Sequence, residues 1–140
     1  MKSSIFKKEY QAILTGHLTN KNGKIDASIA RKDGSIIERE INFETGEKAI
    51  TYYRVLNEFY INDTPLSLVN FLLETGRTHQ IRLHSKYLGN PIIGDTLYGE
   101  KSNLINRQAL HAYKISFIHP ISKENIILEI DLPDDMKKIL

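Results

Sequence analysis

Three basic side chains, His79, Arg82 and Lys86, recur within one short stretch of the chain. At about 100° per residue in a helix, they share a polar arc with Thr78 and Ser85. A guanidinium such as that of Arg82 can make a two-pronged contact with a carboxylate or a phosphate, and the N-terminal end of a helix also favours negative charge. The stretch therefore predicts a site for an anionic group.

The elements that would position these side chains have recognisable start and stop signals. A continuous apolar run at residues 66–73 predicts a strand, and Thr75-Gly76 predicts the turn after it, because glycine adopts backbone angles that other residues resist. We expect a helix that is capped by the Thr78 hydroxyl, runs to about residue 88 and stops at Gly89.

The remainder of the chain is typical of short strands separated by polar turns. We predict strands at residues 10–14, 24–27, 36–43, 49–59, 109–118 and 126–132, and a C-terminal helix at residues 134–140. The strands on either side of the Asn62-Asp63-Thr64-Pro65 turn would form a hairpin, and the second would be central because both of its faces are apolar. We therefore expect an α+β fold with a mixed, mainly antiparallel sheet and a few helices.

Composition limits the class of protein. The 140 residues suit one domain with one core, and the absence of cysteine excludes a disulfide framework and a thiolate metal site. No apolar run approaches the roughly 20 residues of a membrane helix, and the first residues, MKSSIFKKE, lack the apolar segment of a signal peptide. A cytoplasmic protein without a membrane partner fits best. The net charge of +2 is too small to indicate nucleic-acid binding by itself, so any such contact must come from local basic patches.

Residues 75–82, TGRTHQIR, begin a series of short motifs that continues beyond the predicted helix. The series resembles the signature of the RluA-type RNA pseudouridine synthases, and it covers only the C-terminal half of such an enzyme. The further matching segments are GNPI at residues 89–92, Gly94-Asp95, Tyr98-Gly99, KEYQA at 8–12, GKIDA at 23–27, LHAY at 110–113 and FIHP at 117–120.

The resemblance implies a reaction, and it also implies a catalytic motif that this sequence lacks. Enzymes of this type isomerise uridine to pseudouridine in ribosomal or transfer RNA, without a metal or cofactor, and carry a His-Arg-Leu-Asp motif whose Asp attacks the nucleotide. That motif does not occur in this sequence. We therefore expect residues 1–140 to form a single partial catalytic domain, either a fragment or the product of a split gene, which is inactive by itself.

The resemblance also implies roles for particular residues. Tyr10 would lie against the uracil, because a base that has left its stack needs another flat surface. Arg82 would pair with the absent Asp and lower its pKa, and Leu110 would help to form an apolar wall. On its residue type alone, Tyr10 is more often a half-buried strand residue. The implied RNA contacts are Lys8, Arg77, Thr78, His79 and Lys86.

Other polar residues are better explained by structure than by catalysis. We expect Asp95 to fix its loop through backbone N–H groups, and Tyr98 to act as a packing residue. Asp26 is read as a strand or turn carboxylate. The histidines, at positions 79, 84, 111 and 119 in this half of the chain, fit no zinc pattern and are read as hydrogen-bonded structural residues or at most RNA contacts.

Three other interpretations remain open. The chain could be a non-catalytic RNA-binding module that grips phosphate and stacks a base. It could be the complementing half of a split enzyme, with the N-terminal half as its partner. A different phosphate-binding enzyme is a weaker third, because no Gly-rich phosphate loop is present. A half-domain would also expose a sheet edge and an apolar face, which predicts self-association or a homodimer.

Overall fold

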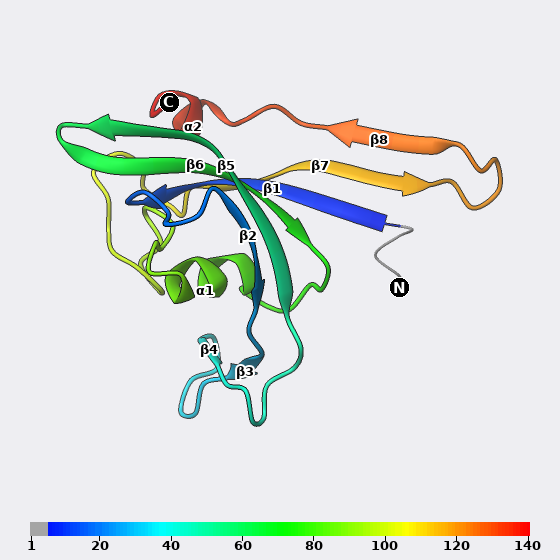
Figure 1. Ribbon diagram of the computed structural model, residues 1–140, viewed down its shortest axis with the longest axis horizontal. Coiled ribbons are helices and arrows are strands. Elements are labelled where there is room, and N and C mark those ends of the chain that lie inside the picture. Colours follow the sequence, from blue (N-terminus) through cyan, green and yellow to red (C-terminus); the bar gives the residue numbers. More distant parts are fainter. Residues whose placement is uncertain (1–5) are drawn as a thin grey trace.

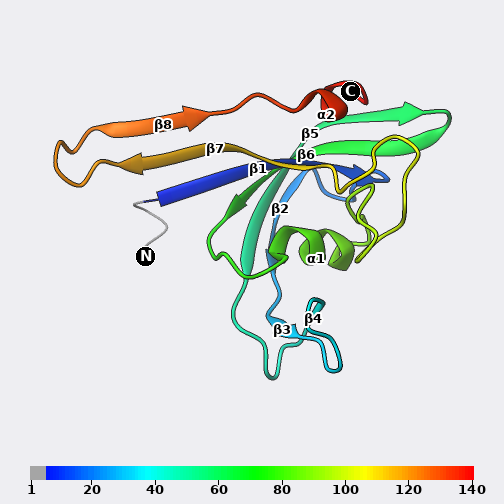
Figure 2. The ribbon, with the colours of Figure 1, turned by 180° about the vertical axis from the view of Figure 1, so that it is seen from behind.

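The structure is a computed structural model that describes residues 6–140. Six strands pair in the order β2-β5-β6-β1-β7-β8, and every pairing among the described strands is antiparallel (Figures 1 and 2). The expected α+β fold with a mainly antiparallel sheet is confirmed. The strands are β1 (Phe6–Thr15), β2 (Asn22–Asp26), β5 (Ile50–Ile61), β6 (Thr64–Leu73), β7 (Leu110–Ile118) and β8 (Asn125–Glu129).

The β5–β6 hairpin forms where the sequence predicted it. Asn62 and Asp63 both have positive φ, at 49° and 66°, which is the requirement of a two-residue type I′ turn. The turn twists in the same sense as the strands, so the hairpin extends as a long ribbon (Figure 1). β6 lies inside the sheet between β5 and β1, as its two apolar faces indicated.

The core lies on both faces of the central strands. Ile13, Leu14, Leu66, Val69 and Phe71 are all almost fully buried. Helix α1 (Gln80–Tyr87) covers one face, and the short helix α2 (Asp134–Lys137) lies on the other side of the sheet (Figure 1). α2 is shorter than the predicted helix at residues 134–140. Within residues 6–140, no helix combines the length and apolar character needed to cross a membrane.

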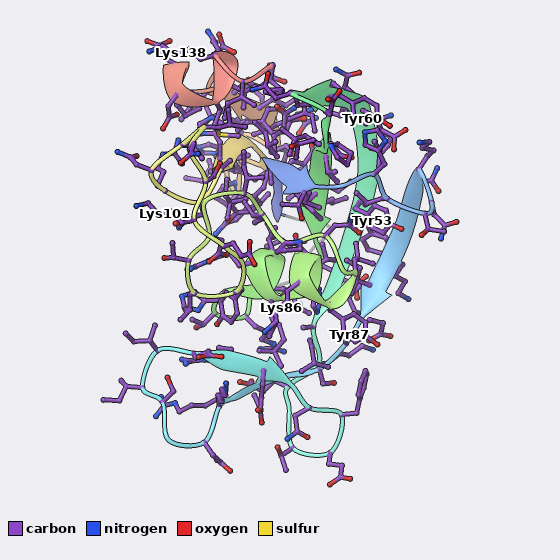
Figure 3. The ribbon with its side chains drawn as sticks, turned by 90° about the vertical axis from the view of Figure 1, so that its left-hand side faces the viewer. Tyr53, Tyr60, Lys86, Tyr87, Lys101 and Lys138 are labelled. Carbon is purple, nitrogen blue, oxygen red and sulfur yellow. The ribbon has the colours of Figure 1, made fainter. Side chains whose placement is uncertain are left out.

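Two short strands form a separate sheet that the sequence did not predict correctly. β3 (Ile29–Arg31) pairs with β4 (Arg39–Ile41), and both lie beyond α1 on the side away from the main sheet (Figures 1 and 3). The predicted strand at residues 36–43 is therefore wrong in extent. Ile36 and Ile37 are 85% and 63% exposed in the connecting loop, where no neighbouring strand buries them.

Helix α1 begins later than predicted. His79 occupies the N-cap position with left-handed φ and ψ of 59° and 22°, and no side chain caps the helix, so the predicted Thr78 cap is wrong. The preceding turn is held instead by Gln80, whose backbone N donates to the Arg77 carbonyl at 3.1 Å. Gly76 does not adopt a positive φ. The predicted stop is confirmed, because Gly89 follows the helix with a φ of 90°.

Candidate active site

The side chain of Arg82 is held by a carboxylate within this chain. Its Nε and Nη2 donate to the two carboxylate oxygens of Asp95, each at 2.9 Å. The Asp95 side chain is completely buried and that of Arg82 is 16% exposed. A two-pronged pair of this kind fixes the plane of the guanidinium as well as its position.

Asp95 also organises its own loop, as the sequence predicted. The backbone N–H groups of Leu97 and Tyr98 donate to its Oδ1 at 3.1 and 3.2 Å. Burial by itself would raise the pKa of Asp95, but the hydrogen bonds from Arg82 and these two N–H groups outweigh it and hold the pKa below its ordinary value. Asp95 in turn raises the pKa of Arg82. Both partners are therefore charged at neutral pH.

One edge of the Arg82 guanidinium is not used by this pair. Among the described residues, Nη1 has no hydrogen-bond partner, whereas Nε and Nη2 are both occupied by Asp95. The guanidinium can therefore bind a second anion through Nη1 while it stays paired with Asp95. The sequence did not indicate that Arg82 would already be paired within the chain.

Tyr98 links Arg82 to the residues around it. The Arg82 Cζ lies 5.2 Å from the centre of the Tyr98 ring, a cation–π distance. The Tyr98 Oη accepts a hydrogen bond from the Arg39 backbone N at 2.8 Å and lies 2.8 Å from His79 Nδ1. Burial and, after it, the charge of Arg82 lower the pKa of His79. The neutral ring can therefore accept a hydrogen bond at Nδ1 from the Tyr98 hydroxyl. Tyr98 is 4% exposed, which agrees with the packing role predicted for it.

Helix α1 is tied to the main sheet by Gln80. Its Nε2 donates to the Ile50 carbonyl at 3.0 Å and to Thr51 Oγ1 at 2.9 Å. Its Oε1 accepts from Thr75 Oγ1 at 2.8 Å and from the Arg77 backbone N at 3.0 Å. The buried amide is thus fully satisfied and sets the start of the helix against β5.

His84 makes the second tie between α1 and the sheet. Its Nδ1 lies 2.8 Å from Thr51 Oγ1 and its Nε2 lies 2.9 Å from the Ala27 carbonyl, so the structural role predicted for it is confirmed. Burial lowers its pKa, which keeps the ring neutral. Ser85, expected on the polar arc, is wholly buried instead, because this side of the helix faces the core.

Tyr10 and Leu110 lie on the face of the sheet that α1 covers. Tyr10 is opposite Phe71 on one side and Ala112 on the other, and Leu110 is opposite Ala12, so these side chains share that face. Tyr10 and Leu110 are half-buried at the margin of the core, and Ala112 is exposed. None of the hydrogen bonds, ion pairs or ring contacts within residues 6–140 joins Tyr10 to Arg82.

The predicted RNA-binding residues do not all lie together. Arg77, Thr78 and His79 are adjacent at the start of α1, and Lys86 projects from the same helix near its end (Figure 3). Arg77 is partly engaged, since its Nε donates to the Lys48 carbonyl at 2.8 Å. Lys8 is exposed on β1, in a different part of the molecule.

The remaining polar candidates have structural positions. Asp26 is the exposed last residue of β2. His111 Nε2 lies 2.9 Å from the Ile130 carbonyl, and His119 Nδ1 accepts from two backbone N–H groups of its own turn. Within the part of the chain that the structure describes, no three His, Cys, Asp or Glu side chains are grouped as metal ligands would be.

Known proteins with similar structures share this arrangement of strands. The chain superimposes on the structure of Human RNA Pseudouridylate Synthase Domain Containing 1 with a TM-score of 0.79 and 29% identity, over 94% of this chain and 56% of that one. Human RNA Pseudouridylate Synthase Domain Containing 4 gives a TM-score of 0.69 at 22% identity, over 94% of this chain and 60% of the other, and supports the fold.

Sequence comparisons agree with the structural ones. The chain is 45% identical to the Bacillus subtilis protein named Uncharacterized RNA pseudouridine synthase YjbO, over 99% of this chain and 47% of the relative. It is 36% identical to Ribosomal large subunit pseudouridine synthase D of Zymomonas mobilis, over 93% of this chain and 43% of that protein. The chain thus spans about half the length of these relatives. The RNA pseudouridylate synthase family matches residues 1–87, and the chain therefore belongs to this family, as an RluA-type member that covers part of the catalytic domain.

Proposed function

We propose that residues 1–140 provide the guanidinium and the base-stacking side of an RluA-type active site, which isomerises uridine to pseudouridine in ribosomal or transfer RNA. The nucleophilic Asp comes from outside these residues. The observation that carries the proposal is the geometry of Arg82, which Asp95 holds by Nε and Nη2 while Nη1 has no partner among the described residues. A carboxylate that approaches this edge meets a cation already fixed in orientation.

The chemistry assigns a separate task to each candidate. The C1′–N1 bond of uridine breaks, the uracil turns, and a C1′–C5 bond forms; C5 then loses a proton and N1 carries one. Arg82 keeps the incoming carboxylate ionised beside the sugar. Tyr10 supplies a flat surface for the detached uracil, and Leu110 helps to exclude water from its path. No cofactor is required, and we expect the reaction to take place in the cytoplasm.

A complementation assay tests this proposal. The purified chain is incubated with uridine-containing ribosomal or transfer RNA, alone and with the N-terminal half of an RluA-type enzyme that carries His-Arg-Leu-Asp. Pseudouridine is then measured by mass spectrometry of the digested RNA. We expect no product from the chain alone, and product from the pair.

Variants then assign the activity to the site. Arg82→Ala should abolish product formation by the pair, because removal of a charge-assisted hydrogen bond costs about 1.5–3 kcal/mol and the poorer positioning of the carboxylate adds to this cost. Arg54→Ala is the matched control, since Arg54 is exposed on β5 and should leave the activity unchanged. Turnover by the chain alone, or full activity of Arg82→Ala, would contradict the proposal.

We also infer two alternatives. The chain is the complementing half of a split enzyme, or it binds RNA without catalysis through basic residues such as Arg77 before α1 and Lys86 near its end. Tight RNA binding combined with no product when the N-terminal half is present would favour the non-catalytic module.

A further inference from the structure

A polar hollow of about 400 Å³ lies beside the start of α1. Three separate segments line it: the paired strands β3 and β4, the segment before β5, and the turn that precedes α1. The residues that matter for its charge are Arg31, Arg39, Arg77 and Glu47. Three arginines and one glutamate therefore line the same small space.

Two of these arginines are held against each other by the fold. Arg31 and Arg39 are directly opposite in the β3–β4 pairing, so their side chains leave the same face of this sheet. Like charges in directly opposite positions destabilise a strand pair. The ion pairs of the described residues include neither arginine, and the Arg39 guanidinium is bound only by the carbonyls of Ile36 and Ile37. An anion between them would relieve the repulsion.

The third arginine has only a weak competitor for such an anion. Arg77 Nη1 lies 3.3 Å from Glu47 Oε2, but the Glu47 side chain is 75% exposed, and exposed ion pairs contribute little free energy. Arg77 Nε donates to the Lys48 carbonyl, which fixes the direction of the guanidinium. Arg77 thus lines the hollow with its guanidinium held by the Lys48 carbonyl, and its only ion pair among the described residues is this exposed one.

The hollow adjoins the Arg82 site through one residue. The Arg39 backbone N–H donates to Tyr98 Oη at 2.8 Å, and the Tyr98 ring lies beneath the Arg82 guanidinium. The basic hollow and the Arg82 site are therefore linked by the contact between Arg39 and Tyr98. Figure 3 shows the short β3–β4 sheet, which supplies part of the lining of the hollow, beneath α1.

We propose that this hollow is a binding site for a backbone phosphate of the RNA, next to the target uridine, with Arg31 and Arg39 as its principal ligands. The inference rests on the proposed function, since it takes RNA to be the substrate. Guanidinium groups match phosphate with two parallel hydrogen bonds, and a polar cluster of arginines fits a phosphate better than a base.

Salt dependence of RNA binding tests the site. Binding of a fluorescent, uridine-containing stem-loop RNA to the full chain is measured by anisotropy at several salt concentrations. Arg31→Ala combined with Arg39→Ala should weaken binding and reduce the slope of log K against log salt by about 0.7–0.9 for each phosphate that the protein no longer neutralises. Arg54→Ala, which removes an exposed arginine on the opposite face of the main sheet, should leave both unchanged.

A charge reversal separates binding from folding. Arg31→Glu would face Arg39 as an opposite charge, so its Tm should equal or exceed that of the wild type while its RNA affinity falls further than that of Arg31→Ala. Unchanged affinity and slope in the double variant would overturn the phosphate site and leave the proposed function standing. Failure of the wild-type chain to bind RNA would overturn this inference, whereas the complementation assay decides the proposed function separately.

Discussion

At Arg82, the geometry depends on a buried acid rather than on the arginine alone. Asp95 occupies two of its nitrogens at 2.9 Å, and two backbone N–H groups hold that acid in turn. A long, flexible side chain is thereby given one orientation before any substrate arrives. Asp95 thus fixes the orientation of Arg82, and in the proposed function it would be a positioning residue that acts through Arg82.

Replacement of Asp95 should show how much the buried pair with Arg82 contributes to the stability of the fold. Asp95→Asn keeps the shape but removes the charge, so we expect the free energy of unfolding at neutral pH to fall by about 3 kcal/mol, in the range for breaking a buried pair. The pKa of Asp95 is lowered in the folded state, so this contribution is present above the ordinary pKa of about 3.9 and is lost as pH falls through the folded-state value.

Urea denaturation of both proteins at neutral and acidic pH measures this difference. The variant and the wild type should converge in acid. Thr96→Ala, an exposed position in the same loop, is the control. Equal stability of Asp95→Asn and wild type at neutral pH would show that the pair does not stabilise the fold.

At the scale of the element, α1 is positioned by buried polar groups rather than by its propensity alone. An isolated helix of eight residues is too short to be stable in water. Gln80 and His84 hold it to β5 and to the segment after β2 through four hydrogen bonds. The helix therefore carries Arg82 at a fixed height above the sheet.

His84 makes this attachment sensitive to pH. Burial lowers its pKa, so in mild acid the unfolded chain gains a proton that the folded chain does not. The contribution of His84 to the free energy of unfolding is therefore complete above the ordinary histidine pKa of about 6.5, and it is lost as pH falls below that value. The pKa of His79 is also lowered, which adds to the effect in the same direction.

Denaturant titrations between about pH 5 and pH 8 would test this. At about pH 8, we expect the free energy of unfolding of His84→Gln to be about 1–3 kcal/mol below that of the wild type, because the substitution removes the hydrogen bonds of His84. As the pH falls, the variant should lose stability less steeply than the wild type. His119→Gln, which changes a histidine in the exposed β7–β8 turn outside this attachment, is the matched control. An identical slope in His84→Gln would rule out this histidine as the source.

At the scale of the whole molecule, one exposed apolar surface lies around the edge strand β8. β2 and β8 are the edges of the main sheet. Around β8, Ile127, Leu128 and Ile130 are 52%, 55% and 66% exposed, and Ile121 in the adjoining turn is 86% exposed. An unpaired edge with apolar side chains invites pairing with another chain.

Self-association should follow from this surface. We expect the mass measured by light scattering to rise with protein concentration, and Leu128→Lys to reduce the rise by placing a charge on the edge. Ile36→Lys, an equally apolar and exposed position in the β3–β4 loop, should not reduce it. A wild-type chain that stays monomeric at high concentration would contradict the prediction.

The sequence by itself determined the family, the α+β class, the β5–β6 hairpin, the stop of α1 at Gly89 and the loop role of Asp95. Each of these depends on neighbouring residues or on a run of motif residues, such as the Asn62-Asp63 turn, whose positive φ values are a local property. Local signals of this kind are readable because the interactions that they encode span only a few positions.

Only the tertiary structure decided which distant residues meet. Arg82 and Asp95 lie 13 positions apart across a turn, and nothing in their spacing shows that they pair. The β3–β4 sheet was missed because its strands are three residues each and are stabilised by packing of Ile29 against Leu83 and Tyr98 rather than by their own pattern. The N-cap of α1 was misplaced because Gln80, bonded to β5, decides where the helix begins. Contacts of this kind are set by how the chain folds back on itself, which a one-dimensional pattern does not contain.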